Sequence, residues 1–190
     1  IEGGSCEAAP VGQHVPLWGS NSAIECLAGS WQNQTGQSSC IEAIPGQYVD
    51  VNGSSSQTPC ATGTWQNQTG QTGCMNASVG HYVDVNGSSS QTPCAMGTWN
   101  NMTGQAACTN ASAGHYVDTN GSTTQTPCDA GTYNPNSSST SSTDCLDTPA
   151  GNYSGPGAPA PTPCSIGSWQ DQSGQAGSYT HLTLPTTLVV

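Results

Sequence analysis

Two residue types carry the chemistry of this chain: cysteine, and asparagine in the acceptor motif for N-linked sugar. The cysteines stand at positions 6, 26, 40, 60, 74, 94, 108, 128, 145 and 164. Ten of the 13 asparagines begin an Asn-x-Ser/Thr motif. These asparagines are Asn33, Asn52, Asn67, Asn76, Asn86, Asn101, Asn110, Asn120, Asn136 and Asn152. The sequence therefore predicts disulfide formation and attachment of sugar to side-chain amides.

Three of these motifs have a tryptophan two residues before the asparagine. The pairs are Trp31 with Asn33, Trp65 with Asn67, and Trp99 with Asn101. This arrangement resembles the enhanced aromatic sequon, in which the first sugar packs on the ring at a hairpin turn. Such a contact would supply apolar burial that the protein itself lacks. The alternative is that tryptophan only fills the hairpin face, and Trp169, which is followed by Asp171 in place of asparagine, favours that alternative.

Other polar residues favour structural roles over metal binding or catalysis. Asp50 precedes an Asn-Gly turn, but the spacing does not fit an EF-hand loop, so we expect a turn-capping carboxylate and no calcium. His81 and His115 take the position that Gln47 holds in another copy of the repeat, which indicates a solvated face and no metal site. No Ser-His-Asp set, Cys-His pair, phosphate loop or pair of carboxylates is recognisable, so we expect neither an enzyme nor a cofactor.

The composition argues against several partners and against a large core. Leu, Ile, Val and Phe make up about a tenth of the 190 residues, and the net charge is −11 without a single Lys or Arg. Nucleic acid and anionic membranes bind through cationic side chains, so we expect neither as a partner. No apolar run is long enough to span a bilayer. Ten cysteines indicate disulfide-stapled units in an oxidising, extracellular compartment, at the cell surface.

A repeat of 17 residues underlies these motifs, and alternate copies differ, which gives a full period of 34. Glycines mark the short period at Gly46, Gly63, Gly80, Gly97, Gly114 and Gly131. An aromatic residue follows each of them by two positions: Tyr48, Trp65, Tyr82, Trp99, Tyr116 and Tyr133. Residues 48–74 return almost unchanged as residues 82–108. Such self-similarity is typical of an array whose units stack on their neighbours.

Turn signals predict that each 17-residue block is a β-hairpin. The signals are Asn52-Gly53 and Asn86-Gly87, and in the alternate blocks Gly70 and Gly104, which close turns containing Asn67 and Asn101. Asn-Gly is the strongest short signal for a tight hairpin. We expect strands of about four to six residues and no helix. The predicted fold is all-β, an elongated, disulfide-stapled tandem-repeat rod of short hairpins with little regular secondary structure.

The 17-residue frame favours disulfides within blocks. We number the positions of each 17-residue block from 1 and call them slots. Cys60 and Cys74 occupy slots 1 and 15 of one block. The preceding block has Ala43 and Gln57 in these slots, so both cysteines are present or both are missing. The favoured pairs are Cys26–Cys40, Cys60–Cys74, Cys94–Cys108 and Cys128–Cys145. Closing one such loop is worth about 3 kcal/mol in the chain-entropy model. The rival pairing joins cysteines across the 20-residue gaps and leaves none over.

The unit Cys60-Ala61-Thr62-Gly63-Thr64-Trp65 with Cys74 resembles the cysteine-rich repeats of ephrin-receptor-like and TNF-receptor-type ectodomains. Modules of that family open with Cys-x-x-Gly-x-Tyr and close on a cysteine at a similar distance. The resemblance implies an elongated, hairpin-based rod whose first two cysteines are paired. Every second block here lacks its cysteines, and the family's later crossed pairs are missing, so the ligand-binding role of those receptors is not carried over.

The cysteines divide the chain into five repeats and a tail. They are a divergent repeat truncated upstream (1–40), two regular repeats (41–74 and 75–108), a repeat with a Ser/Thr insertion (109–145), a Pro-rich divergent repeat (146–177) and the tail (178–190). The tail begins SYTHLTLPT, which resembles a transposase-based sequencing adapter translated in frame. We therefore expect an artefact there, the alternative being a genuine short β-prone segment. In the favoured pairing Cys6 belongs to a block upstream, and the partner of Cys164 falls at position 178, a serine.

These features predict a non-enzymatic, extracellular structural glycoprotein. We expect a fragment of a tandem-repeat subunit of a glycan-coated filament or surface appendage, with copies of itself as partners. The alternative is the stalk or ligand-binding ectodomain of a cell-surface receptor or adhesin. Near-identical neighbouring units favour the filament, because binding hot spots concentrate in a few specialised residues rich in Trp, Tyr and Arg.

Overall fold

The structure, a computed structural model, describes residues 6–177. The chain divides into two compact units: unit 1 is Ile1–Pro93 with Met102–Ala107, and unit 2 is Cys94–Asn101 with Cys108–Val190. Each unit is a succession of two-stranded antiparallel hairpins, so the all-β prediction is confirmed. The suspected artefactual tail lies outside the described residues. Across residues 6–177, no helix has the length and apolar character needed to cross a membrane.

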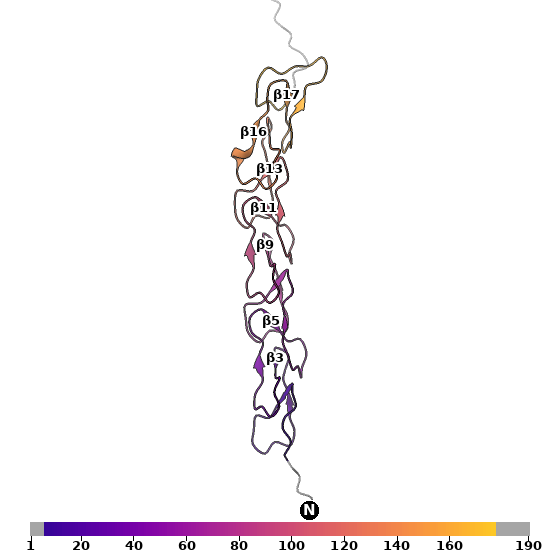
Figure 1. Ribbon diagram of the computed structural model, residues 1–190, viewed down its shortest axis with the longest axis vertical. Helices are drawn as coiled ribbons and strands as arrows, with labels where there is room; N and C mark the ends of the chain where they lie inside the picture. Colours follow the sequence, from indigo (N-terminus) through magenta and orange to yellow (C-terminus); the bar gives the residue numbers. More distant parts are fainter. Residues whose placement is uncertain (1–5, 178–190) are drawn as a thin grey trace, which may run out of the picture. The chain divides into compact units, whose positions relative to one another are not determined.

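In unit 1 every hairpin pairs two strands of two residues each. The pairs are β1 (Gln13–His14) with β2 (Ile24–Glu25), β3 (Ser30–Trp31) with β4 (Ile41–Glu42), β5 (Gln47–Tyr48) with β6 (Thr58–Pro59), β7 (Thr64–Trp65) with β8 (Met75–Asn76), and β9 (His81–Tyr82) with β10 (Thr92–Pro93). Within this unit β3, β5 and β9 follow one another in chain order along the ribbon (Figure 1).

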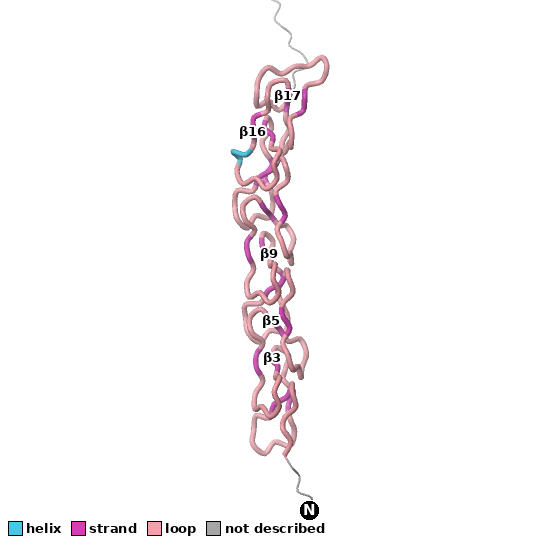
Figure 2. Tube along the Cα trace, in the orientation of Figure 1, coloured by secondary structure: helices cyan, strands magenta, loops and turns pink. Residues whose placement is uncertain are grey.

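Unit 2 repeats the same design. Its pairs are β11 (Thr98–Trp99) with β12 (Thr109–Asn110), β13 (His115–Tyr116) with β14 (Thr126–Pro127), β15 (Thr132–Tyr133) with β16 (Leu146–Asp147), and β17 (Asn152–Tyr153) with β18 (Thr162–Pro163). The Ser/Thr insertion of this unit forms one 3-10 turn, Ser142–Asp144, capped by Ser141. Figure 2 shows how short the strands are against the loops that carry most of the chain.

The expected strand length and the expected tight Asn-Gly hairpins were both wrong. The strands are two residues long, and the loop between β5 and β6 runs from residue 49 to residue 57. Asn52 lies inside that loop, and among the described non-glycine residues only Ser138 has a positive φ. A type I′ hairpin turn needs positive φ at both central residues, so Asn52-Gly53 does not form one.

The strands are short because the backbone groups beside them bond to the next hairpin. On either side of β5, the Gly46 N–H donates to the Gln66 carbonyl at 2.7 Å and the Val49 N–H donates to the Gln71 carbonyl at 3.0 Å. Each hairpin therefore has few hydrogen bonds between its own two strands, and its remaining backbone groups bond to the following block. Buried backbone groups must find partners, and in this chain they find them between repeats.

The core is a column of small side chains, as the low apolar content requires. Slot 1 alternates between cysteine and alanine, and Cys26, Ala43, Cys60 and Ala77 are all fully buried. Slot 7, which follows the aromatic residue, alternates between glutamine and valine in unit 1. The members of that second set are Gln32, Val49, Gln66 and Val83, none more than 4% exposed. Alternating blocks therefore share one backbone and differ in what fills two core positions.

The glycines that mark the 17-residue period, which we call frame glycines, contact the hairpin two places further along the chain. Gly63 has a φ of 81°, and a Cβ atom there would collide with the backbone carbonyl oxygen of Gly104. The same relation joins Gly12 to Gly53, Gly29 to Gly70, Gly46 to Gly87, Gly114 to Gly157 and Gly131 to Gly174. Only glycine combines the left-handed conformation with this close approach. The 17-residue glycine period is thus a consequence of stacking.

Candidate functional site

Four disulfides close hairpins, and they join the pairs that the 17-residue frame favours. They are Cys26–Cys40, Cys60–Cys74, Cys94–Cys108 and Cys128–Cys145, with Cα–Cα distances of 5.7, 5.8, 5.8 and 5.8 Å. The first cysteine of each pair is buried in the core column and the second is half-buried. Cys6, which is exposed, and Cys164, which is half-buried, are free thiols in the described part of the chain.

Three blocks without cysteines in slots 1 and 15 are closed by a glutamine, which the sequence analysis missed. Gln57 Oε1 accepts a hydrogen bond from the Ile44 N–H at 3.0 Å, and Gln91 Oε1 accepts one from the Ser78 N–H at 2.7 Å. Each bond joins slot 15 to slot 2, whereas a disulfide joins slot 15 to slot 1 in the 17-residue blocks that contain two cysteines. The regular occurrence of Gln57, Gln91 and Gln125 in slot 15 was the sequence signal for this closure.

The turn that carries Asn67 is organised by a buried glutamine. Gln66 is 4% exposed; its Nε2 donates to the Gly73 carbonyl at 3.0 Å and its Oε1 accepts from the Gln68 N–H at 3.2 Å. The Gly70 N–H donates to the Ala43 carbonyl of the previous block at 2.8 Å. Asn67 itself is exposed. The fold therefore fixes the backbone of the acceptor motif and leaves the asparagine side chain in solvent.

The same turn recurs around Asn33 with one informative difference. Gln32 makes the equivalent bonds, to the Ser39 carbonyl at 2.9 Å and from the Gln34 N–H at 3.1 Å. The hydroxyl of Thr69, in the Asn67 motif, donates to Glu42 Oε2 at 2.9 Å. The corresponding neighbour of the Asn33 turn is Ala8, which offers no acceptor. Asn33 and Asn101 are exposed, as Asn67 is.

The asparagines of the Asn-Gly motifs have a structural role. The Asn52 Oδ1 accepts from the Ala28 N–H at 2.8 Å, the Asn86 Oδ1 from the Thr62 N–H at 3.0 Å, and the Asn120 Oδ1 from the Met96 N–H at 3.0 Å. Each bond ties one hairpin to the hairpin before it. Because the oxygen accepts this bond, the bond does not consume Nδ2, the atom that carries an N-linked sugar.

The remaining acceptor asparagines fall into two groups. Asn76, Asn110 and Asn136 are exposed. Asn152 is half-buried, and its Nδ2 donates to the Pro149 carbonyl at 3.4 Å and the Ala150 carbonyl at 3.2 Å. The amide nitrogen of Asn152 is therefore engaged within its own turn, unlike the other acceptors.

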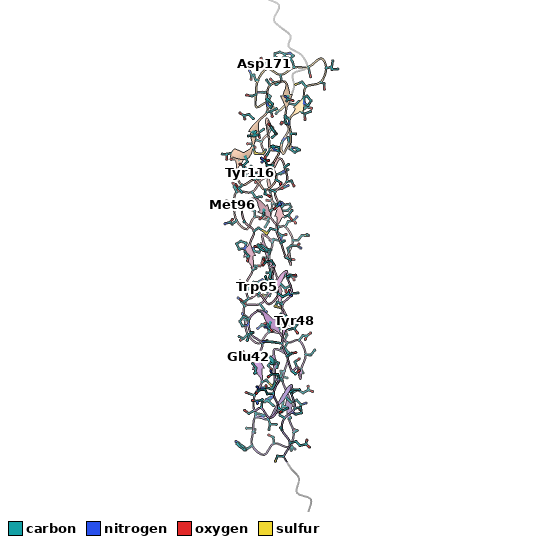
Figure 3. All side chains as sticks on the ribbon, viewed as in Figure 1. Glu42, Tyr48, Trp65, Met96, Tyr116 and Asp171 are labelled. Carbon is teal, nitrogen blue, oxygen red and sulfur yellow. A yellow bond between two sulfur atoms is a disulfide. The ribbon has the colours of Figure 1, made fainter. Side chains whose placement is uncertain are left out.

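The tryptophans beside the acceptor motifs present one edge to the interior. Trp31, Trp65 and Trp99 are half-buried, and within the described residues their indole Nε1 atoms are buried without a hydrogen-bond partner. Trp65 lies on β7 opposite Met75 (Figure 3 labels Trp65). Trp169, which lacks the acceptor asparagine, is 47% exposed. The rings next to asparagine are thus more enclosed than the ring next to Asp171.

The other sequence candidates are exposed or make local contacts. Asp50 is exposed. His81 and His115 are half-buried rather than fully solvated, and their Nδ1 atoms lie 3.1 Å from the Val79 carbonyl and 3.3 Å from the Ala113 carbonyl. Each of these contacts is with the residue two positions earlier in the chain.

One histidine that the sequence analysis overlooked lies against a disulfide. His14 takes the aromatic slot, two residues after Gly12, and its Nδ1 lies 3.2 Å from Cys40 Sγ. With Cys26 it forms a group in which the candidate ligand atoms all lie within 4.8 Å of one another. The signal in the sequence was the replacement of Tyr or Trp by His at a fixed distance from a cysteine.

The fold and these contacts define a disulfide-stapled tandem array of β-hairpins. No protein-family model and no curated protein matches the chain. The resemblance to receptor-type cysteine-rich repeats therefore stays a prediction. The disulfides indicate a secreted or extracellular protein, because such bonds persist in oxidising compartments.

Proposed function

We propose that this chain is a segment of a non-enzymatic structural glycoprotein that forms a glycan-coated filament or surface appendage. In this role the hairpins between Cys26 and Cys145 are equivalent: a disulfide or a glutamine closes each one, backbone hydrogen bonds join it to its neighbours, and its asparagines carry sugar. The partners are copies of the same chain, and the location is the cell surface.

The observation that carries the proposal is the turn built by Gln66 and its equivalents. It holds the backbone of the acceptor motif through buried hydrogen bonds, at 3.0 and 3.2 Å for Gln66, while Asn67 stays exposed. The same design returns at Gln32 with Asn33. Gln170 builds the same turn beside Asp171, with bonds of 3.0 and 3.2 Å, so the buried amide shapes the turn itself. Where the turn exposes an acceptor asparagine, its fixed backbone supports a repeated modification at that asparagine.

The tryptophans support a defined contact with the first sugar. Trp31 and Trp65 are half-buried beside their exposed asparagines. An aromatic face partly open to solvent is a good surface for the apolar face of a sugar ring. The proposal therefore places the first sugar at Asn33, Asn67 and Asn101 against the neighbouring indole.

Intact glycopeptide mass spectrometry of material from the natural source tests the glycan part of the proposal. Cleavage must be at aromatic or acidic residues, because the chain has no Lys or Arg. We expect Asn33, Asn67 and Asn101 to be occupied. Unmodified Asn67 and Asn101 in that material would contradict the proposal.

Electron microscopy of the same material tests the assembly. We expect uniform filaments with sugar density at regular intervals. A soluble monomer that binds one protein through a sugar-free face would instead support the receptor alternative.

A further inference from the structure

We propose that His14, Cys26 and Cys40 form a binding site for a thiophilic divalent cation such as Zn²⁺ once the Cys26–Cys40 disulfide is reduced. His14 Nδ1 lies 3.2 Å from Cys40 Sγ, and the three ligand atoms lie within 4.8 Å of one another. Neutral imidazole and thiolate are the ligands that Zn²⁺ prefers. This site is independent of the proposed structural role of the array.

The geometry of the cluster fits a tetrahedral ion. Zn–S bonds of about 2.3 Å and Zn–N bonds of about 2.0 Å separate a sulfur from a nitrogen ligand by about 3.5 Å, and two sulfurs by about 3.8 Å. The observed nitrogen–sulfur distance of 3.2 Å needs only a small outward movement. The Cα atoms of Cys26 and Cys40 are 5.7 Å apart, so rotation of the two side chains opens their sulfurs to the required separation.

The backbone around the cluster holds the three ligands in place from separate directions. β1 carries His14 and pairs with β2, which ends directly before Cys26. The Cys26 N–H donates to the Gly12 carbonyl at 2.8 Å. Cys26 is fully buried, whereas His14 and Cys40 are half-buried. The half-buried side leaves a fourth coordination position to water.

Binding of the metal ion requires prior reduction of the Cys26–Cys40 disulfide. A dithiol reductant donates two electrons to the Cys26–Cys40 bond and becomes a cyclic disulfide itself, leaving two thiols on the protein. Zn²⁺ then displaces two thiol protons and takes the unprotonated nitrogen of His14. The chain has no Lys or Arg, and its net charge of −11 favours cations near it.

The other disulfides lack the third ligand and provide internal controls. Tyr48 occupies the same position of the repeat relative to Cys74 as His14 occupies relative to Cys40. Tyr116 and Cys145 line one small cavity in unit 2, so the side chain of this slot lies near the second cysteine there too. A reduced Cys60–Cys74 pair offers two thiolates and a phenol, which is not a common Zn²⁺ ligand.

The test uses the whole chain, reduced with a dithiol under argon and then given one equivalent of Zn²⁺. Iodoacetamide labels the free thiols, and mass spectrometry reports the labelling rate of each cysteine. We expect Cys26 and Cys40 to be labelled about 10-fold more slowly than Cys60 and Cys74, because the bound metal masks both thiolates. A His14→Tyr variant should lose this protection, with Zn²⁺ affinity falling by at least about 10-fold.

A gain-of-function variant keeps the proposal falsifiable if the reduced hairpin is easily disturbed. Tyr48→His should create the same ligand set around Cys60 and Cys74 and transfer protection to them. Equal protection of all cysteine pairs, protection of none, or protection of Cys26 and Cys40 that survives His14→Tyr would overturn the proposal. Titration with Co²⁺ gives an independent readout, since sulfur–cobalt charge-transfer bands should appear in the wild type and weaken in His14→Tyr.

Discussion

Gln57 Oε1 accepts a hydrogen bond from the Ile44 N–H at 3.0 Å and closes a hairpin in the slot where the neighbouring blocks have a cysteine. The same bond recurs between Gln125 and Ser112 in unit 2, at 2.7 Å. From Cys26 to Cys145 a covalent closure and a hydrogen-bonded closure thus alternate from one block to the next. Because both fit one backbone, slot 15 is interchangeable between cysteine and glutamine provided that slot 1 changes with it.

Removing the glutamine closure should destabilise unit 1 modestly. Gln57→Ala leaves the Ile44 N–H without its protein acceptor, and we expect the free energy of unfolding to fall by about 1 kcal/mol. Chemical denaturation with the disulfides intact measures this. Gln68→Ala, at an exposed position of the same unit, is the control and should change stability by less than about 0.5 kcal/mol. Equal effects of the two variants would contradict the closure.

The alternation predicts a way to remove a disulfide at reduced cost. Loss of the Cys60–Cys74 bond in a Cys60→Ser/Cys74→Ser variant should lower stability by about 3 kcal/mol. Cys60→Ala/Cys74→Gln copies the alternate blocks and should recover about 1 kcal/mol of that loss through the glutamine hydrogen bond. Denaturation of both variants provides the comparison. If the Ala/Gln variant is no more stable than the Ser/Ser variant, the two closures are not equivalent.

The frame glycines should tolerate no side chain. Gly63→Ala forces a Cβ against the Gly104 carbonyl and strains a backbone with φ of 81°. We expect a loss of about 2 kcal/mol or more, from the left-handed conformation alone. Gly73→Ala is the matched control, since Gly73 has no positive φ and open space at its Cβ. Thermal unfolding of the two variants decides, and a Gly63→Ala protein as stable as Gly73→Ala would contradict the stacking contact.

The contact between Trp65 and sugar should appear as a coupling in a double-mutant cycle. Trp65→Leu and Asn67→Gln are combined in glycosylated protein, and we expect a coupling energy of about 1 kcal/mol if the first sugar packs on the indole. The same cycle at Trp169 and Asp171, where no sugar can be attached, should give none; Figure 3 labels both Trp65 and Asp171. A coupling at both places, or at neither, would show that the tryptophan serves only the hairpin.

Much of the architecture followed from local patterns, and the misses share one cause. The disulfide frame, the hairpin in every block and the poor apolar core could be expected from the spacing of Cys60, Cys74 and Gly63. The tight turn expected at Asn52-Gly53 and the longer strands could not be, because those expectations treated each hairpin as self-contained. In the structure the Val49 N–H bonds to Gln71 in the next block, which ends the ladder early.

The sequence by itself determined which residues are equivalent, because a 17-residue repeat gives every block the same slots, and from Cys26 to Cys145 the cysteines in those slots are present or missing in pairs. The tertiary structure decided what those slots contact. The approach of Gly104 to Gly63 and the contact of His14 with Cys40 join residues of different blocks. Such contacts depend on the rise and rotation from one hairpin to the next, which are set by backbone hydrogen bonds between blocks. The glycine period marks the positions that admit no side chain, but not the residues that those positions approach.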